Sequence, residues 1–198
     1  MARRHDLEIL VVQRCSSRRL GTAVEWHDTL TSTNERARTL AMAGATEGSI
    51  VVADHQTEGR GCMGRSWHSP AGGGLWFSII LHPSASPLLT PRLTTLAAQA
   101  VQDVLHRVLG ISSQLKHPND ILVGGRKICG ILAESSMAAG STRVDYVIIG
   151  VGLNLTTTFD PPLCETATAV ANHTDGPVPS PENLLPSILS AIEERYKP

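Results

Sequence analysis

The sequence lacks the motifs that mark common metal and disulfide proteins. Its four cysteines form no CxxC pair, which argues against both a zinc ribbon and a disulfide scaffold. The eight histidines are scattered, and no HExxH occurs. A transition-metal site held by the protein is therefore not expected, and buried free thiols are the simplest interpretation of the cysteines.

An excess of one charge and long hydrophobic runs are also missing. The net charge is −1 and the pI about 6.7, so nothing indicates binding to nucleic acid or a membrane surface. No apolar run approaches the roughly 20 residues that cross a bilayer. Five arginines precede Gly21, but Asp6 and Glu8 accompany them, unlike in a transit peptide, so we expect a cytoplasmic protein. At 198 residues and 41% hydrophobic content, the chain fits one domain with at most a small appendage.

The hydrophobic pattern predicts about seven strands and three or four helices. Strands are expected at 24–27, 48–54, 75–81, 114–116, 121–123, 126–133 and 144–151, and helices at 7–19, 33–44, 90–110 and 181–196. Ser32 and Glu35 have the spacing of a capping box, Gly124-Gly125 predicts a hairpin turn, and 156–181 reads as a long loop. Because no βαβ repeat occurs, the fold class is α+β with a mixed or antiparallel sheet.

The stretch Gln56–Ser69 stands out because no Asp or Glu occurs between Gly59 and Gln102. Three glycines and two arginines fall within seven residues there, so backbone N–H groups and guanidinium groups can surround an anion. The glycines fit GxGxxG, but that dinucleotide motif needs a helix opening at the glycines and an acid about 20 residues later. Ser69–Gly74 cannot form that helix, so we reject the dinucleotide interpretation. No GxxxxGK[ST] phosphate loop occurs.

Polar residues gather at the ends of five predicted elements. They supply hydroxyls and amides for a polar ligand, cations for anions, and one acid, Asp120, that suits Mg²⁺. An enzyme that joins a carboxylate to the α-phosphate of ATP needs this set, because cations must separate the two anions. The five groups are Ser32-Thr33-Asn34, Gln56–Trp67, Lys116–Asp120, Arg126-Lys127 with Gly130, and Gly150–Asn154.

At these residues the chain resembles the catalytic domain of biotin–protein ligases (biotin–[acetyl-CoA-carboxylase] ligases). The matching motifs lie in the family's order: STN at 32–34, GRGCMGRSWHSPAGG at 59–73, KHPND at 116–120, RKICGILAE at 126–134 and GVGLN at 150–154. The resemblance implies a class II aminoacyl-tRNA synthetase/biotin ligase-like fold, with an N-terminal extension at 1–21 and the catalytic domain at 22–198. It implies that biotin and MgATP give biotinyl-5′-AMP, and that a lysine of a biotin carboxyl carrier protein then takes the biotin.

The resemblance also implies the roles of individual residues. Lys127, Arg60, Asp120 and Lys116 would be catalytic, with Asp120 holding Mg²⁺ and Lys116 facing the phosphates or the incoming lysine. Arg65, Trp67, Asn119 and Asn154 would line the ATP side. Biotin would be bound by Ser32, Thr33, Asn34, Gln56, Gly59, Arg60, Gly61, Cys62, Lys127, Gly130 and Gly152.

The sequence departs from the family pattern at three places. Cys62 replaces the usual basic residue after GRG, which would weaken the hold on the adenylate. His117 replaces the usual Trp before PND. No small C-terminal β domain follows the last helix, and no helix-turn-helix precedes the domain, so we expect no repressor role.

Two alternatives remain open at the level of sequence. A lipoate–protein ligase or octanoyltransferase would share the fold and the acyl-lysine chemistry with a different acyl pocket. A degenerate relative would bind biotin or a carrier protein without turnover. The oligomeric state is also open, with a homodimer as one alternative.

Overall fold

A seven-stranded sheet organises the chain in the computed structural model, which describes residues 4–15, 19–83, 89–137 and 144–196. The strands lie in the order β1-β2-β3-β7-β6-β5-β4. β1 and β2 are parallel, and every other neighbouring pair is antiparallel, which confirms the α+β class with a mixed sheet. The strands are β1 (Ala23–Leu30), β2 (Ser49–Gln56), β3 (Gly74–Leu81), β4 (Gln114–Lys116), β5 (Asp120–Val123), β6 (Arg126–Met137) and β7 (Val144–Asn154).

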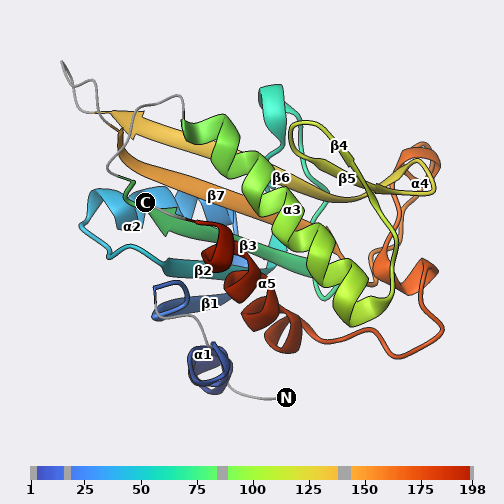
Figure 1. Ribbon diagram of the computed structural model, residues 1–198, viewed down its shortest axis with the longest axis horizontal. Coiled ribbons are helices and arrows are strands. Elements are labelled where there is room, and N and C mark those ends of the chain that lie inside the picture. Colours follow the sequence, from blue (N-terminus) through green and yellow to red (C-terminus); the bar gives the residue numbers. More distant parts are fainter. Residues whose placement is uncertain (1–3, 16–18, 84–88, 138–143, 197–198) are drawn as a thin grey trace.

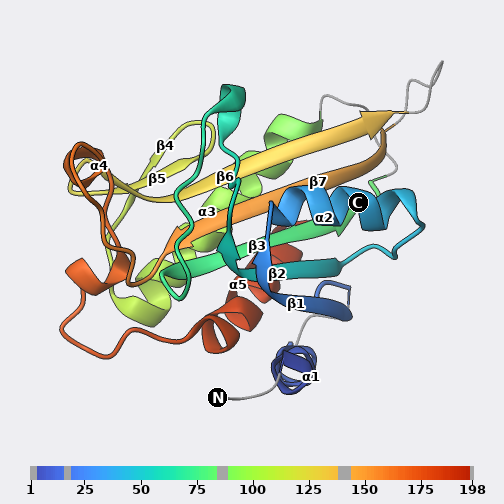
Figure 2. The same cartoon turned by 180° about the vertical axis from the view of Figure 1, so that it is seen from behind.

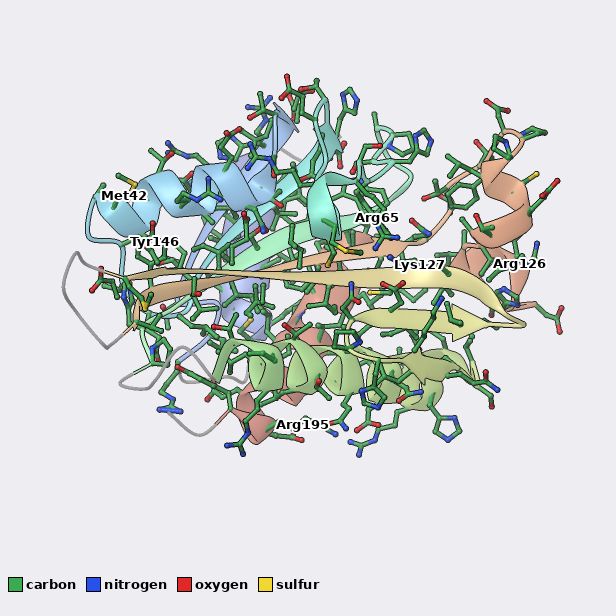
Figure 3. All side chains as sticks on the ribbon, turned by 90° about the horizontal axis from the view of Figure 1, so that it is seen from above. Met42, Arg65, Arg126, Lys127, Tyr146 and Arg195 are labelled. Atoms are coloured by element: carbon green, nitrogen blue, oxygen red, sulfur yellow. The ribbon has the colours of Figure 1, made fainter. Side chains whose placement is uncertain are left out.

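Helices cover both faces of the sheet (Figures 1 and 2). The long helix α3 packs beside α5 on one face, and α2 lies on the other. With the sheet seen edge-on, Arg65 is on the α2 side and Arg195 on the α3 side (Figure 3). The α-helices are α1 (Arg4–Arg14), α2 (Thr33–Met42), α3 (Leu89–Leu109), α4 (Leu163–Thr166) and α5 (Pro181–Arg195).

The alternation of side chains along β3 explains the two layers. Leu75, Phe77 and Ile79 are fully buried in the main core beneath α3 and α5. Ile80 points the other way and joins Ala37 of α2 in a smaller core. Successive side chains of a strand face opposite sides, so an apolar run this continuous requires cover on both faces.

The helix α1 packs against β1 and α5 at the parallel end of the sheet. Its Val11 is fully buried, and the Glu8 carboxylate accepts a hydrogen bond of 2.9 Å from the backbone N–H of Trp26. The helix predicted at 7–19 therefore exists but begins earlier and ends at Arg14, while 16–18 lie outside the described residues. No helix in the described part of the chain is long and apolar enough to cross a membrane.

Two local predictions were wrong. Ser32 precedes α2, but its side chain makes no capping hydrogen bond. Glu35 instead accepts hydrogen bonds from Thr31 Oγ1 at 2.9 Å and from the guanidinium of Arg60 at 3.0 Å, so its carboxylate is drawn away from the helix end. The segment predicted as a loop at 156–181 contains α4 and a short 3₁₀ turn at Val170–Asn172.

Candidate active site

Three glycines of the central strands form the floor of a pocket on the α2 side of the sheet. Gly130 of β6 is paired with Gly152 of β7, and Gly150 of β7 is paired with Ser78 of β3. The cavity above them has a volume of about 40 Å³. It is lined by Ser32, Thr33, Asn34, Gln56, Arg60, Gly61, Cys62, Trp67, Asn119, Lys127, Gly130, Ile131, Leu132, Gly150, Val151 and Gly152.

The floor has to be glycine because neighbouring side chains lie directly on it. A Cβ at Gly150 would be 2.1 Å from Asn34 Oδ1, and one at Gly152 would be 2.5 Å from Trp67 Nε1. Contacts below 3.0 Å are not tolerated without displacement of the neighbour. The glycines of the 150–154 motif therefore let an amide and an indole ring lie flat against the sheet.

One side of the pocket is lined by Thr33, Asn34 and Gln56, and Ser78 supports them from outside the lining. We call these four residues the amide wall. The Gln56 amide oxygen accepts from the Thr33 backbone N–H at 2.8 Å, and the Gln56 amide nitrogen donates to Ser69 Oγ at 2.8 Å. Ser78 Oγ lies 2.8 Å from Thr33 Oγ1 and 2.7 Å from Asn34 Oδ1. These side chains are joined into one buried network, so the amide wall is rigid before any ligand arrives.

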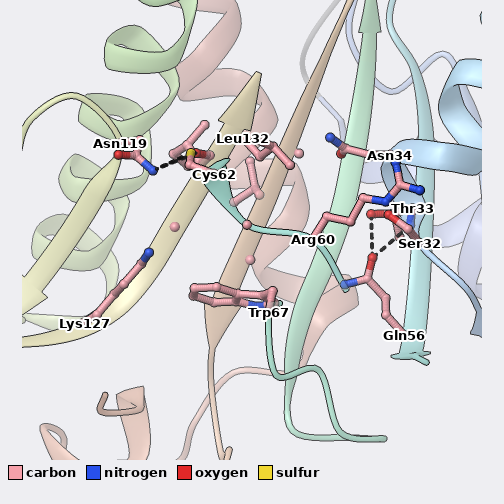
Figure 4. A pocket seen from close by; sticks show the side chains of 16 residues that line it. Ser32, Thr33, Asn34, Gln56, Arg60, Cys62, Trp67, Asn119, Lys127 and Leu132 are labelled. Carbon is pink, nitrogen blue, oxygen red and sulfur yellow. Dashed lines mark hydrogen bonds between the residues drawn. The ribbon is translucent and has the colours of Figure 1, made fainter. Parts of the chain in front are cut away.

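The opposite side is lined by Asn119 and Lys127 of the β5–β6 hairpin, and Asp120 lies beside Lys127 outside the cavity lining. We call these three residues the lysine wall. Lys127 Nζ is 2.7 Å from Asp120 Oδ1 and 5.0 Å from the centre of the Trp67 ring. Figure 4 shows Lys127 and Asn119 across the pocket from Asn34 and Thr33. The hairpin turns at Gly124-Gly125, as the sequence predicted, and this turn places Asp120 beside Lys127.

Arg60 lies on the amide wall's side of the pocket, across from Lys127 (Figure 4). Its guanidinium donates to Glu35 at 3.0 Å, and both side chains are about 40% exposed, at 40% and 42%. An exposed ion pair of this kind is worth at most about 1 kcal/mol, so an anionic ligand could displace Glu35 from Arg60.

Trp67 closes the pocket from the Gln56–Ser69 loop. Its ring meets Trp76 edge to face with ring centres 6.4 Å apart, and its backbone N–H donates to Gly59 O at 2.8 Å. Gly59 itself does not line the cavity. A Cβ there would be 2.4 Å from Trp67 O, so this glycine permits the tight turn of the loop.

Cys62 occupies the position next to Asn119. The amide nitrogen of Asn119 donates to Cys62 Sγ at 3.1 Å and to Ile131 O at 3.2 Å (Figure 4). Cys62 thus accepts a hydrogen bond from the lysine wall and brings no charge to the pocket. All four cysteines are free thiols, but only Cys129 is fully buried, and burial raises the pKa of its thiol, so it stays neutral.

Several residues that the sequence placed in the site lie outside the cavity. Lys116 is exposed on β4, directly across from Asp120 in the strand pairing. Arg65 is exposed, and its Nε donates to Cys62 O at 3.1 Å. Asn154 is buried, and its amide nitrogen donates to Thr168 O at 3.0 Å and Lys127 O at 3.4 Å.

Other residues of the site carried no functional prediction. Ser78 is the only polar residue in the otherwise apolar β3 run, and that interruption was an available signal. Glu134 of β6 accepts from the Asn34 amide nitrogen at 2.7 Å and from Arg38 at 2.7 Å. No group of three or more His, Cys, Asp or Glu that could hold a metal ion exists among the described residues.

Among the solved structures with this fold are biotin protein ligases. The chain is similar to a biotin protein ligase from Aquifex aeolicus in complex with biotin and ATP, with a TM-score of 0.73 and 32% identity, over 87% of this chain and 69% of that chain. It is also similar to a biotin protein ligase from Leishmania major in complex with biotinyl-5-AMP, with a TM-score of 0.73 and 27% identity, over 87% of this chain and 74% of that chain. The chain therefore shares the fold of biotin protein ligases.

Residues 26–154 match the Biotin/lipoate A/B protein ligase family, and the chain belongs to this family. It is 42% identical over 181 residues to the bifunctional ligase/repressor BirA of Bacillus subtilis, which covers 90% of this chain and 55% of that protein. It is 39% identical over 126 residues to a biotin–[acetyl-CoA-carboxylase] ligase of Paracoccus denitrificans, and the match covers 63% of this chain and 51% of that protein. The chain thus spans about half the length of the curated relatives it matches, and the family resemblance seen in the sequence is confirmed.

Proposed function

We propose that this domain activates biotin with ATP to biotinyl-5′-AMP and transfers the biotin to a lysine of a biotin carboxyl carrier protein. The observation that carries the proposal is one pocket with two chemically different sides. The amide wall offers a fixed set of hydrogen-bonding groups for a neutral polar ring. The lysine wall offers a cation whose counterion is a single carboxylate, Asp120, 2.7 Å away.

The adenylation step requires two anions to meet. A carboxylate oxygen of biotin bonds to the α-phosphorus of ATP while the bond to the β-phosphate bridging oxygen breaks, and pyrophosphate leaves. Lys127 on the lysine wall and Arg60 across from it are the two cationic residues of the cavity lining. Both ammonium and guanidinium donate to oxygens whose charge grows in the transition state, which is the largest usual source of catalysis.

The residues present fit a magnesium ion that arrives with ATP. Mg²⁺ is usually held by one or two carboxylates together with substrate phosphates, and Asp120 is the carboxylate beside Lys127. When bound, the ion would neutralise charge on the departing pyrophosphate. Asp120 would then exchange its contact with Lys127 for the metal, which leaves the Lys127 ammonium to donate to the biotin carboxylate.

In the transfer step the lysine amine of the carrier attacks the acyl carbon of the adenylate. The acyl carbon–oxygen bond breaks, AMP leaves with the electron pair, and the amine's proton passes to solvent. Asn34, Thr33 and Gln56 keep the ring in place during this exchange of partners, because their own hydrogen bonds do not depend on the phosphates.

The proposal is tested by biotin-dependent exchange of labelled pyrophosphate into ATP, followed by transfer of labelled biotin to a carrier domain. We expect exchange with biotin and none with lipoate. Exchange with lipoate alone would replace the proposal with a lipoate ligase. Binding of biotin without exchange would identify a binding module. A protein that neither binds biotin nor supports exchange would overturn both the proposed ligase and the binding module.

A further inference from the structure

Glu134 of β6 lies behind the amide wall and holds two side chains of α2. Its Oε2 accepts from Asn34 Nδ2 at 2.7 Å, and its Oε1 accepts from the Arg38 guanidinium at 2.7 Å. Glu134 does not line the cavity, whereas Asn34 does. Hydrogen bonds to an ionised carboxylate are shorter and stronger than neutral ones, so this contact is the firmest anchor of the Asn34 amide.

The carboxylate settles which way the Asn34 amide faces. An ionised carboxylate can only accept hydrogen bonds, so the NH₂ group must face Glu134 and the amide oxygen must face Ser78. The Arg38 guanidinium orients Glu134 through its second oxygen. The amide orientation is therefore dictated by a residue outside the pocket.

This orientation decides where the Ser78 proton goes. Ser78 Oγ has two acceptors, Asn34 Oδ1 at 2.7 Å and Thr33 Oγ1 at 2.8 Å, and the amide oxygen that faces it makes the shorter contact. The Thr33 hydroxyl donates to Gln56 Oε1 at 3.1 Å, which also accepts from the Thr33 backbone N–H. Both hydroxyl protons are therefore used inside the wall.

We propose that Glu134, held by Arg38, is a positioning residue that fixes the Asn34 amide with its oxygen toward Ser78 and thereby sets selectivity for a cyclic urea. The Asn34 oxygen, together with the Thr33 hydroxyl whose proton is used on Gln56, meets a ligand as an acceptor, the role that a ureido N–H requires. The inference rests on the proposed function, because it assigns the ureido ring of biotin to the amide wall.

Substitution of Glu134→Gln tests the inference because a glutamine side chain can also donate. Its NH₂ group can face Asn34, which allows the Asn34 amide to flip and turn its own NH₂ group toward Ser78. We expect biotin affinity, measured by calorimetry without ATP, to fall about tenfold or more. The preference for biotin over 2-iminobiotin, which differs in the ureido group, should fall with it. The preference over biotin sulfone, which differs only at sulfur, should not change.

A matched control is available on the same helix. Arg36 of α2 forms an ion pair with Glu25 of β1 at 2.9 Å, so Glu25→Gln removes a comparable link from α2 without touching the amide wall. Arg38→Met should reproduce the loss of ureido selectivity, whereas Arg38→Lys, which keeps the cation, should largely restore it. Thermal melting checks that each variant is folded, and the KM for ATP should stay within about twofold of wild type.

The outcomes separate the two proposals. Wild-type protein that binds no biotin overturns the proposed function. The positioning role is overturned if wild-type protein binds biotin and Glu134→Gln protein keeps the same affinity and the same selectivity between biotin and 2-iminobiotin. Loss of affinity for biotin, biotin sulfone and ATP in equal proportion, matched by Glu25→Gln, would show that Glu134 only stabilises the fold and would also overturn it.

Discussion

The amide wall and the lysine wall face each other across one cavity but are built in opposite ways. In the amide wall, each of Thr33, Asn34, Gln56 and Ser78 is bonded to another member of the set or to its support. In the lysine wall, the one cation is held by one carboxylate and by the face of one ring. Fixed hydrogen-bonding groups suit recognition of a neutral ring. A cation that binds phosphates must instead be able to exchange its carboxylate partner for them.

Among substitutions that test the difference between the two walls, Lys127→Ala is expected to have the largest effect. No other described cation occupies the lysine wall, so biotin-dependent pyrophosphate exchange should fall at least about 100-fold. The control is Arg126→Ala, an exposed neighbour on the same strand that does not line the cavity. Near-normal exchange by the Lys127 variant would remove its assigned role.

The amide wall can be disrupted by a substitution in the glycine floor beneath it. In Gly150→Ala the new Cβ would lie 2.1 Å from Asn34 Oδ1, so the amide must move off the sheet. Biotin affinity should fall about tenfold or more, and unfolding free energy by about 1–3 kcal/mol, the usual cost of forcing an extra methyl group into a packed site. Calorimetry and denaturant melts measure the two effects. Gly176→Ala should change neither, because the new Cβ would lie no closer than 3.7 Å to its nearest neighbour, the Thr174 hydroxyl. Biotin affinity equal to wild type in both variants would contradict the floor's role.

Asp120→Asn tests the lysine wall separately, because it removes charge from that wall alone. The concentration of Mg²⁺ that gives half-maximal exchange should rise about tenfold, because the carboxylate ligand is lost. Biotin affinity without ATP should change little, since the amide wall is untouched. An unchanged magnesium dependence would show that Asp120 serves only as the partner of Lys127.

A smaller effect is expected at Cys62, where the pocket lacks the cation usual in the family. Cys62→Arg should slow release of biotinyl-5′-AMP by up to about fivefold, since a partly exposed ion pair contributes at most about 1 kcal/mol. Release is followed by rapid filtration of enzyme loaded with labelled adenylate, and stray labelling of bystander lysines should fall in parallel. If the release rate does not change, Cys62 is a small packing residue beside Asn119.

The sequence predicted the strands better than their arrangement. Continuous apolar runs such as Leu75–Leu81 identify a buried strand, but nothing local places β7 between β3 and β6. That arrangement is what brings Gly152 beside Gly130, so the floor could not be foreseen from either motif alone. Pairing between strands distant in sequence depends on the whole sheet and has no local signal.

Within the site, the sequence motifs were more informative about which residues matter than about what each does. Asn154 belongs to a motif of the family, but the structure turns its amide toward two backbone carbonyls. Glu35 has the spacing of a cap, yet its carboxylate meets Arg60. Glu134 resembles an ordinary polar residue on a strand, and only its distance of 2.7 Å from Asn34 reveals its contact with the pocket wall. Each outcome depends on a partner far away in the sequence.

The glycine floor also affects the entropy of binding. The floor glycines have no side-chain rotamers to lose, and the Asn34 amide that lies on Gly150 is already held by Glu134 and Ser78 before a ligand binds. The loss of rotamer freedom on binding, about 0.5–1.5 kcal/mol for each long side chain that becomes fixed, therefore falls on residues such as Arg60 and Lys127. Binding of the ring should consequently carry a small conformational entropy loss, and most of that loss should come with the nucleotide.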